Sequence, residues 1–278
     1  MLAGHSGVNT ASPAYAADLL NKALRNTIIL STGCKGLDIL LNDGLWTGEM
    51  VEICGVPGAG KTQLCKTVCA NVVCETDTHV LFVDCCGSFV CDRFAEIVTA
   101  RKAFVNPQHF DGVLSRIRLL RVLNAEGLLA EIEQTEQELI SKKQVFYSDL
   151  RLVVVDSINA LVSPILGGGQ TQGHMIMTKI GRILKRLAVE HNLAVIVTNS
   201  AVKDAANEGY KPALGKTWKS MPSTRLFLQT TEYSNRYHAR LIKSNIHVSL
   251  CNGIQTWCLS ETNVDTSIPE LLRDSKPC

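Results

Sequence analysis

The chain has 278 residues, of which 46% are hydrophobic and 19% charged, and its formal net charge is +2. This composition is typical of a globular protein with one large domain and a short appendage. The small net charge does not by itself indicate a nucleic-acid-binding protein, and no run of about 18 uncharged apolar residues predicts a membrane span. The first residues lack the basic start and apolar centre of a signal peptide, so we expect the chain to remain in the cytosol or nucleus.

The sequence contains 11 cysteines, but none of them belongs to a C-x-x-C pair. Cys65 and Cys69 have the spacing of one helix face, and Cys85 is followed directly by Cys86. Zinc sites usually bring their thiolate ligands in closely spaced pairs, so this pattern gives little support to a zinc site. We expect reduced thiols, most of them buried and packing as small apolar residues.

Short apolar runs alternate with helical patterns from residue 28 onward. The runs predict strands at Met50–Cys54, His79–Asp84, Ile117–Arg121, Leu152–Asp156 and Leu193–Thr198. The helical periodicity predicts helices at Thr62–Cys74, Glu126–Ser141 and Gly173–His191. Because the strands are continuously apolar, they are typical of a mostly parallel sheet that helices cover on both faces. The sequence therefore predicts a three-layer α/β fold.

The pattern changes after Thr224, where helices are no longer expected between the strands. Short runs at Arg225–Gln229, His238–Ile242 and Ile254–Leu259 predict an antiparallel C-terminal extension at the edge of the sheet. Residues 1–26 lack clear periodicity and are interpreted as a linker or N-terminal tail. The predicted organisation is this tail, a core over residues 27–265 and a C-terminal tail over residues 266–278.

A glycine-rich segment between a strand and a helix fits the pattern G-x-x-x-x-G-K-[ST] completely. It consists of Gly55, Val56, Pro57, Gly58, Ala59, Gly60, Lys61 and Thr62, and Gln63 follows it. The glycines let the backbone turn sharply and point its N–H groups at a phosphate, and the helix N-terminus adds a positive dipole end. Lys61 is expected to contact the β- and γ-phosphates of ATP, and the Thr62 hydroxyl to bind Mg²⁺. The alternative is a glycine-rich turn with a surface lysine.

The apolar run Leu152–Asp156 ends in a carboxylate. The carboxyl end of a central parallel strand lies beside the phosphate loop, so Asp156 can hold Mg²⁺ through a water molecule. The alternative is an aspartate that caps a helix or a turn. The position of this strand after the phosphate loop favours the magnesium role.

Four segments resemble the RecA/RadA recombinase family. Leu40–Gly55 resembles the family's approach to the phosphate loop, and Leu81–Phe94 resembles its second strand and the following turn. Pro212–Trp218 is similar to a signature of the eukaryotic recombinase paralogues, and Val162–Gly168 resembles the D-type paralogue most. The resemblance implies a RecA-like P-loop NTPase core with ATP and Mg²⁺. It also implies other recombinase paralogues and single-stranded or branched DNA as partners, no membrane, and a nuclear location with some cytoplasmic protein.

The sequence departs from this family at two positions that bear on ATP hydrolysis. The family places an acidic residue, which activates the attacking water, where this chain has Cys86. A neutral thiol is a poor substitute for a carboxylate base. The family usually has a γ-phosphate-sensing glutamine where this chain has Ser200, whose side chain is too short for the same reach. The departures imply ATP binding with a weak DNA-dependent ATPase activity at most, and we assign no catalytic residue with certainty.

The resemblance also implies roles for residues around the adenine and the DNA. Arg93 aligns with an arginine that stacks on adenine, although an ordinary arginine on a helix surface is the alternative. Ser163–Gly173 and Lys203–Trp218 correspond to the two loops that line the DNA path. The candidate DNA contacts are Lys203, Lys211, Lys216 and Trp218, with Lys219 just after them. The alternative is a solvated loop with a buried tryptophan.

The N-terminal residues bear on how the chain docks onto other subunits. Tyr15–Ala17 is similar to the linker element by which these proteins dock onto a neighbour, and a disordered tail is the alternative. Family members usually carry a small helical domain before this linker. The chain begins almost at the linker, so we expect that domain to be missing.

Three hypotheses for the function follow. The first is an ATP-binding accessory subunit of a recombinase-paralogue complex, which supports homologous recombination and the repair of double-strand breaks and replication forks and binds single-stranded DNA. The second is an active, filament-forming, DNA-dependent recombinase ATPase, and the residue at position 86 discriminates between the two. The third, a small-molecule P-loop kinase, predicts an arginine-rich acceptor-binding lid, which the sequence does not contain.

Overall fold

The computed structural model describes residues 15, 18, 26–101, 106–166, 171–204, 209–231, 236–245, 254–259 and 264–265. For residue 236 and for the last two ranges it describes the backbone alone. Within these residues, ten strands form the main sheet in the order β12-β11-β10-β9-β3-β7-β6-β4-β5, with β8 paired to β7. A separate small sheet pairs β1 (Ile29–Leu30) with β2 (Leu45–Trp46).

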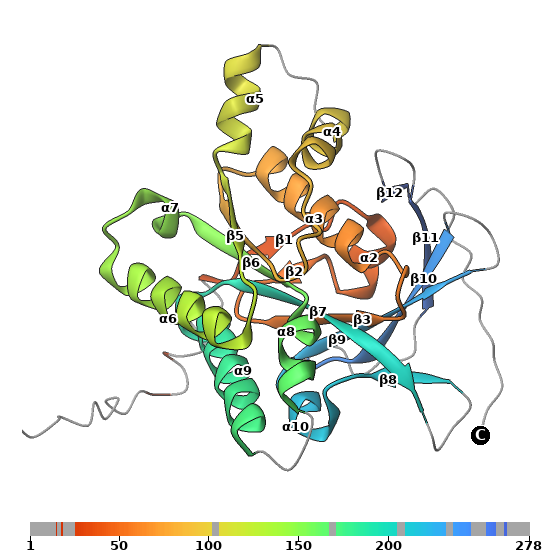
Figure 1. The fold of residues 1–278 in the computed structure, drawn as a ribbon. Coiled ribbons are helices and arrows are strands. Elements are labelled where there is room, and N and C mark those ends of the chain that lie inside the picture. Colours follow the sequence, from red (N-terminus) through yellow and green to blue (C-terminus); the bar gives the residue numbers. More distant parts are fainter. Residues whose placement is uncertain are drawn as a thin grey trace, which may run out of the picture.

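Five consecutive strands of this order, β3-β7-β6-β4-β5, are paired in parallel, and helices cover both faces of the sheet (Figure 1). These strands are β3 (Met50–Gly55), β4 (His79–Asp84), β5 (Ile117–Arg121), β6 (Leu150–Asp156) and β7 (Ala194–Lys203). One face carries α2 (Lys35–Leu40), α3 (Lys61–Glu75), α4 (Cys91–Arg101) and α5 (Pro107–Leu114). The other carries α6 (Ala125–Ser141), α8 (Ile158–Val162), α9 (Thr171–His191) and α10 (Gly215–Lys219). The predicted three-layer α/β fold with a mostly parallel sheet is confirmed.

The C-terminal strands extend the sheet beyond β3. β9 (Thr224–Thr230) still runs parallel to β3, and antiparallel pairing begins with β10 (Arg236–Lys243). It continues through β11 (Ile254–Leu259) and β12 (Val264–Asp265). The predicted antiparallel extension is therefore confirmed from β10 onward, whereas its first strand is parallel. The reason is that α10 lies between β7 and β9 as a crossover, which parallel pairing requires.

Some elements differ from the sequence-based expectation. The sequence patterns did not predict α4, α5 or β8 (Tyr210–Pro212), and β8 pairs with an extension of β7. The predicted loop Ser163–Gly173 begins as the short helix η1 (Ser163–Leu166) and ends inside α9. Gly173 is buried there, and a Cβ atom on it would lie 1.9 Å from the carbonyl oxygen of Ile165. This close approach explains why a glycine stands in the first turns of a helix.

The core consists of two apolar layers, one on each face of the sheet. Leu152 and Val154 of β6 belong to the layer beneath α3, whereas Val153 and Val155 belong to the layer that α6 and α9 cover. All four side chains are buried. Since successive residues of a strand point to opposite faces, a strand that is covered on both sides has a continuous apolar run.

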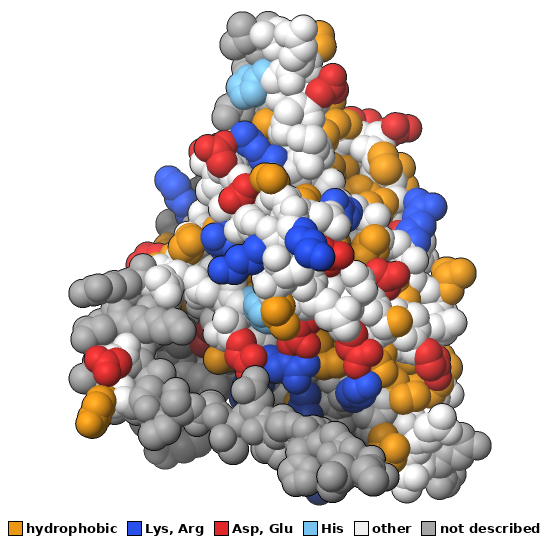
Figure 2. Space-filling model, turned by 90° about the vertical axis from the view of Figure 1, so that its left-hand side faces the viewer, with side chains coloured by type: hydrophobic (Ala, Val, Ile, Leu, Met, Phe, Trp, Pro, Cys, Tyr) orange, Lys and Arg blue, Asp and Glu red, His pale blue; other side chains and the backbone are white. Residues whose placement is uncertain are grey.

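The helices α6 and α9 keep their charged residues on the outside. Lys179 pairs with Glu133 at 2.6 Å, and Arg186 pairs with Glu136. Figure 2 shows acidic and basic side chains interspersed on the side of the molecule that carries α6 and α7 (Val145–Ser148). Surface ion pairs contribute little to stability, so the apolar layer holds these helices in place. In the described part of the chain, none of the helices has the length and apolar character needed to cross a membrane.

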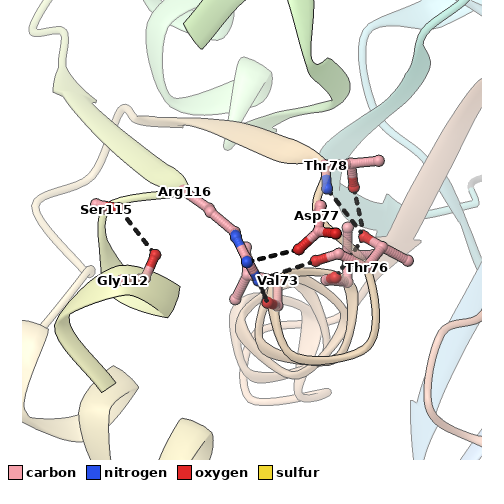
Figure 3. Close-up of polar contacts among 8 residues, drawn as sticks. Val73, Thr76, Asp77, Thr78, Gly112, Ser115 and Arg116 are labelled. Carbon is pink, nitrogen blue, oxygen red and sulfur yellow. Dashed lines mark hydrogen bonds and ion pairs between the residues drawn. The ribbon is translucent and has the colours of Figure 1, made fainter. Parts of the chain in front are cut away.

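Arg116 closes the C-terminal end of α3 (Figure 3). Its Nη1 donates to the carbonyl oxygens of Val73 at 3.0 Å and Thr76 at 3.1 Å, and its Nη2 donates to Asp77 Oδ1 at 2.6 Å. The last carbonyl groups of a helix lack partners within the helix, and a cation there also interacts favourably with the helix dipole. Arg116 therefore ties the helix that follows the phosphate loop to the start of β5.

Arg116→Ala should lower the free energy of unfolding by about 1–3 kcal/mol, because two helix-terminal carbonyl groups lose a charged donor. Asp77→Ala is the matched control. It removes an ion pair whose carboxylate is exposed but leaves both carbonyl bonds, so its effect should stay below about 1 kcal/mol. Urea denaturation followed by circular dichroism measures both variants. Equal losses in the two would contradict the role of Arg116 at the helix end.

Candidate nucleotide-binding site

The phosphate-loop motif forms the connection between β3 and α3. Gly55 ends the strand, and Gly58 and Gly60 both have a left-handed φ of +79°. Glycine adopts this conformation without the steric cost that a Cβ atom brings. At Gly55, a Cβ atom would lie 2.4 Å from the carbonyl oxygen of Leu228 on β9. The backbone of the loop therefore requires glycine at these three positions.

Lys61 is the first residue of α3, and its side chain folds back over the loop. Its Nζ donates to the carbonyl oxygens of Gly55 and Val56, each at 2.9 Å. Burial lowers the pKa of Lys61, and the nearby Asp156 carboxylate acts in the opposite direction. The ammonium group thus lies within the loop that the sequence predicts as the phosphate site.

Asp156 is buried at the carboxyl end of β6. Its Oδ1 accepts a hydrogen bond from the Thr198 hydroxyl at 2.5 Å, whereas its Oδ2 has no hydrogen-bond partner among the described residues. A buried carboxylate oxygen without a partner is unfavourable. Water bound to Mg²⁺ would supply such a partner, so the oxygen donors of Thr62 and Asp156 fit the magnesium ion that the sequence predicts.

The register of the parallel strands brings the strand ends of the site together. Gly55 lies opposite Ser200 on β7, and Asp84 lies opposite Asp156. All four therefore lie at the carboxyl edge of the sheet, where ligands bind in open α/β sheets. Ser200 is half-buried there, and its Oγ accepts a hydrogen bond from Asn159 Nδ2 at 3.1 Å.

Asp84 organises the turn that carries Cys86. Its carboxylate accepts hydrogen bonds from the backbone N–H groups of Cys86 at 3.2 Å, Ser88 at 3.0 Å and Phe89 at 3.0 Å. Arg121 approaches the same carboxylate at 3.9 Å. Cys86 itself is exposed. The position at which the resemblance implies an acid therefore presents a thiol at the surface of this turn.

Lys66 is a residue of the site that the sequence analysis missed. Its Nζ donates to the carbonyl oxygen of Ser88 at 2.7 Å and lies 5.4 Å from the centre of the Phe89 ring. Burial lowers the pKa of Lys66, and the carboxylates of Asp156 and Asp84 act in the opposite direction. The available signal was a lysine inside an otherwise apolar stretch of α3. Lys66 ties this helix to the turn that carries Cys86.

Three further predictions concern residues around this site. Gln63 lies half-buried on α3. Arg93 lies on α4, where its Nη1 pairs with Glu96 Oε2 at 2.7 Å, and its adenine-stacking role stays a prediction. In the predicted docking element Tyr15 is exposed, while residues 16 and 17 lie outside the described residues.

The predicted DNA contacts fall into two groups. The lysines at 203, 211, 216 and 219 are exposed, and Lys211 pairs with Asp204 at 2.8 Å. Trp218, in contrast, is fully buried, and its Nε1 donates to Glu52 Oε1 at 2.9 Å. The prediction that Trp218 stacks on a base is therefore wrong. The indole packs in the core, as the alternative interpretation held.

Most of the cysteines in the described part of the chain are buried. Six lie in the interior, and only Cys86 and Cys91 are exposed among those described. Burial raises the pKa of the Cys34 thiol to about 11 and raises that of Cys65 well above its usual value. The prediction of buried thiols that pack as small apolar residues is confirmed for these positions.

A loop of this conformation, placed between a central strand and the helix that covers the sheet, defines the class of P-loop nucleotide-binding proteins. Within this class, the sequence profile of the Rad51 family matches residues 23–261. The chain therefore belongs to the Rad51 family, and the predicted RecA-like core is confirmed.

Individual relatives agree with this assignment. DNA repair protein RAD51 homolog 4 of Bos taurus is 39% identical over 225 residues, which cover 81% of this chain and 68% of that protein. The Mus musculus protein of the same name is 38% identical over 223 residues, 80% of this chain and 67% of that protein. DNA repair protein RAD51 homolog 2 of Mus musculus is 31% identical over 262 residues, 80% and 72% of the two chains. The predicted resemblance to the D-type recombinase paralogues is confirmed.

Lys61→Ala should weaken ATP binding by about 1.5–3 kcal/mol, because a charge-assisted contact to the phosphates is lost. This corresponds to an increase in Kd of roughly 10- to 150-fold. Lys35→Ala is the control, since Lys35 is also the first residue of a helix but is exposed on α2. Titration calorimetry with ATP and Mg²⁺ measures all three proteins. Equal affinities of the wild type and Lys61→Ala would refute the phosphate site.

Proposed function

We propose that this chain is an ATP-binding accessory subunit of a recombinase-paralogue complex. It binds single-stranded DNA and acts in the nucleus in homologous recombination and in the repair of double-strand breaks and replication forks. The observation that carries the proposal is the buried Asp156 oxygen without a described partner, beside a complete phosphate loop, at an edge where position 86 is a thiol. The relatives that are named DNA repair proteins support the cellular role.

The residues of the loop divide the binding of ATP among them. The backbone N–H groups of the loop and the N-terminus of α3 would accept the β- and γ-phosphates. Lys61 would exchange its bonds to the carbonyl oxygens of Gly55 and Val56 for contacts to these phosphates. Thr62 and Asp156 would hold Mg²⁺, which neutralises phosphate charge when bound.

Turnover requires a base that activates the attacking water, and no carboxylate among the described residues of the site is left for this role once Asp156 holds Mg²⁺. Asp84 lies in the same turn as Cys86, but its carboxylate already accepts three backbone hydrogen bonds. Cys86 carries a thiol, which is a weak base when neutral. Ser200 Oγ is engaged with Asn159. Bound ATP would therefore be long-lived, and its main effect would be on conformation and subunit contacts.

The second candidate is an active recombinase ATPase that forms filaments on DNA. Membership of the Rad51 family is the observation that favours it. It needs a water-activating acid and a side chain that senses the γ-phosphate. A cysteine at position 86 and a serine at position 200 supply neither, so the accessory role accounts better for the sequence.

With single-stranded DNA and Mg²⁺, the wild-type protein should hydrolyse ATP more slowly than about 1 s⁻¹, the low end for typical enzymes. Cys86→Glu should raise the rate of hydrolysis. The gain should be limited, because the Ser200 side chain is still too short to sense the γ-phosphate. Cys91→Glu adds a carboxylate at another exposed cysteine and is the matched control. Release of labelled phosphate measures the rates. A wild-type rate of about 1 s⁻¹ or more would favour the second candidate. Equal rates of the two variants would contradict the proposal that the residue at position 86 limits hydrolysis.

Alone, the chain should be monomeric or should aggregate. With another recombinase paralogue, it should form a stable heteromer. Light scattering coupled to size-exclusion chromatography measures this, with the chain alone and after mixing with candidate paralogues. If ATP sets the subunit contacts, Lys61→Ala should give less heteromer in the presence of ATP and Mg²⁺, and Lys35→Ala should not. Long homofilaments on single-stranded DNA would contradict the accessory role.

A further inference from the structure

A buried carboxylate lies at the centre of the sheet, outside the nucleotide site. Glu52 of β3 is fully buried, and neighbouring elements on both sides of this strand donate to it. Its Oε1 accepts from Asn199 Nδ2 on β7 at 2.7 Å and from Trp218 Nε1 on α10 at 2.9 Å. Its Oε2 pairs with Arg225 Nε on β9. One carboxylate on β3 therefore contacts three elements, β7, α10 and β9, that lie far from it in the sequence.

The pairing of Glu52 with Arg225 makes this arrangement specific. Arg225 is also buried, so each charge relies on the other for compensation. A buried ion pair is tolerated only when its geometry and its additional hydrogen bonds are good. The orientation of the carboxylate is thus fixed, and this fixes where the indole N–H of Trp218 has to lie.

The segment around α10 is held at further points. Asn199 Nδ2 also donates to the carbonyl oxygen of Ala213 at 3.1 Å. The Trp218 ring packs against α9, where a Cβ atom on Gly181 would lie 3.2 Å from it. Lys243 of β10 donates to the carbonyl oxygens of Lys219 and Pro222. The backbone of α10 is therefore held before, within and after the helix.

Two exposed lysines lie on this short helix. At about 3.6 residues per turn, Lys216 and Lys219 lie roughly 160° and 100° around the helix axis from Trp218. With the indole fixed in the core, both ammonium groups face outward. Neither forms an ion pair with another described residue, whereas Lys211 is paired with Asp204. Lys216 and Lys219 are consequently available to an anionic partner.

We propose that Glu52 is a positioning residue for DNA binding: by holding Trp218, it presents Lys216 and Lys219 together to the phosphates of single-stranded DNA. This inference rests on the proposed function, since it names the residues that would contact DNA in that function. Trp218 acts from the interior as the anchor of the lysine pair and does not contact the DNA.

The test is a double-mutant cycle on the full chain. Trp218→Phe removes the indole N–H that reaches Glu52 and keeps an aromatic ring beside Gly181. Trp46→Phe is the matched control, because the indole of Trp46 donates to the carbonyl oxygen of Asn42, outside this cluster. Each protein is made with and without the pair Lys216→Ala and Lys219→Ala. Fluorescence anisotropy then gives the affinity for a labelled oligothymidine over a range of salt concentrations.

The slope of log K against log salt is negative. In the wild type and in Trp46→Phe, loss of the two lysines should make it shallower by about 1.4, since each single-strand phosphate contact contributes about 0.7. In Trp218→Phe, loss of the lysines should change the slope by less, because Asn199 and Lys243 still hold the backbone on either side of the helix but do not replace the bond that fixes the indole, and with it the direction of the two lysines. The same reduction in all three folded proteins would overturn the proposal.

Two further outcomes separate this inference from the proposed function. If the wild type binds the oligothymidine but loss of the lysines changes nothing, the positioning role is wrong while DNA binding stands. If the wild type binds ATP but no DNA, the DNA-binding part of the proposed function fails together with the inference. Glu52→Gln provides a second variant, which keeps the acceptor for Trp218 but leaves Arg225 without its counter-charge. Should it fold, it should retain more of the lysine effect than Trp218→Phe, and the reverse order would contradict the proposed contact.

Discussion

The hydrogen-bond register of the parallel strands places Gly55 beside Ser200 and Asp84 beside Asp156. Each of these residues ends a buried run of its strand or follows it directly, so the packing of the apolar core sets their positions. A shift of one residue in this register would turn every side chain of a strand to the other face of the sheet. The site therefore depends on the packing of the two apolar layers. The position of the phosphate loop is set by β3, which it follows directly.

In the proposed function, ATP binding and ATP turnover would depend on different residues at this edge. Lys61 lies over the loop, where its Nζ donates to two carbonyl oxygens, and Asp156 has one carboxylate oxygen without a partner among the described residues. The turn after β4 is equally well formed, because Asp84 holds it through three backbone N–H groups. What this turn presents is a thiol. An intact scaffold with a changed side chain at position 86 fits an ATP-binding role in which hydrolysis is slow.

Much of this could be predicted from the sequence, because local patterns carry it. The continuous apolar runs located the central strands, and the glycine pattern located the loop, whose backbone then required those glycines. Trp218 and Glu52 could not be placed in this way. Their contact joins residues 166 positions apart, and the Arg225 partner of Glu52 lies 173 positions away. No local period reports such a pair, so an exposed stacking tryptophan and a buried anchor look alike in the sequence.

α4 and α5 were missed for a related reason. Only three residues of α4 and one of α5 are buried, so each helix has too few apolar positions to show a clear helical period. Lys66 was missed because a lysine on a helix usually lies in solvent, whereas here its ammonium group reaches the carbonyl oxygen of Ser88.

The most direct test of the account is the identity of the nucleotide that the protein retains. The chain would be incubated with ATP, Mg²⁺ and single-stranded DNA, freed of unbound nucleotide by rapid gel filtration, and denatured for chromatography of the released nucleotide. An intact phosphate loop without a free base predicts that the retained nucleotide is almost entirely ATP. Recovery of mainly ADP would contradict the account, because it would mean that the site turns over the ATP that it binds.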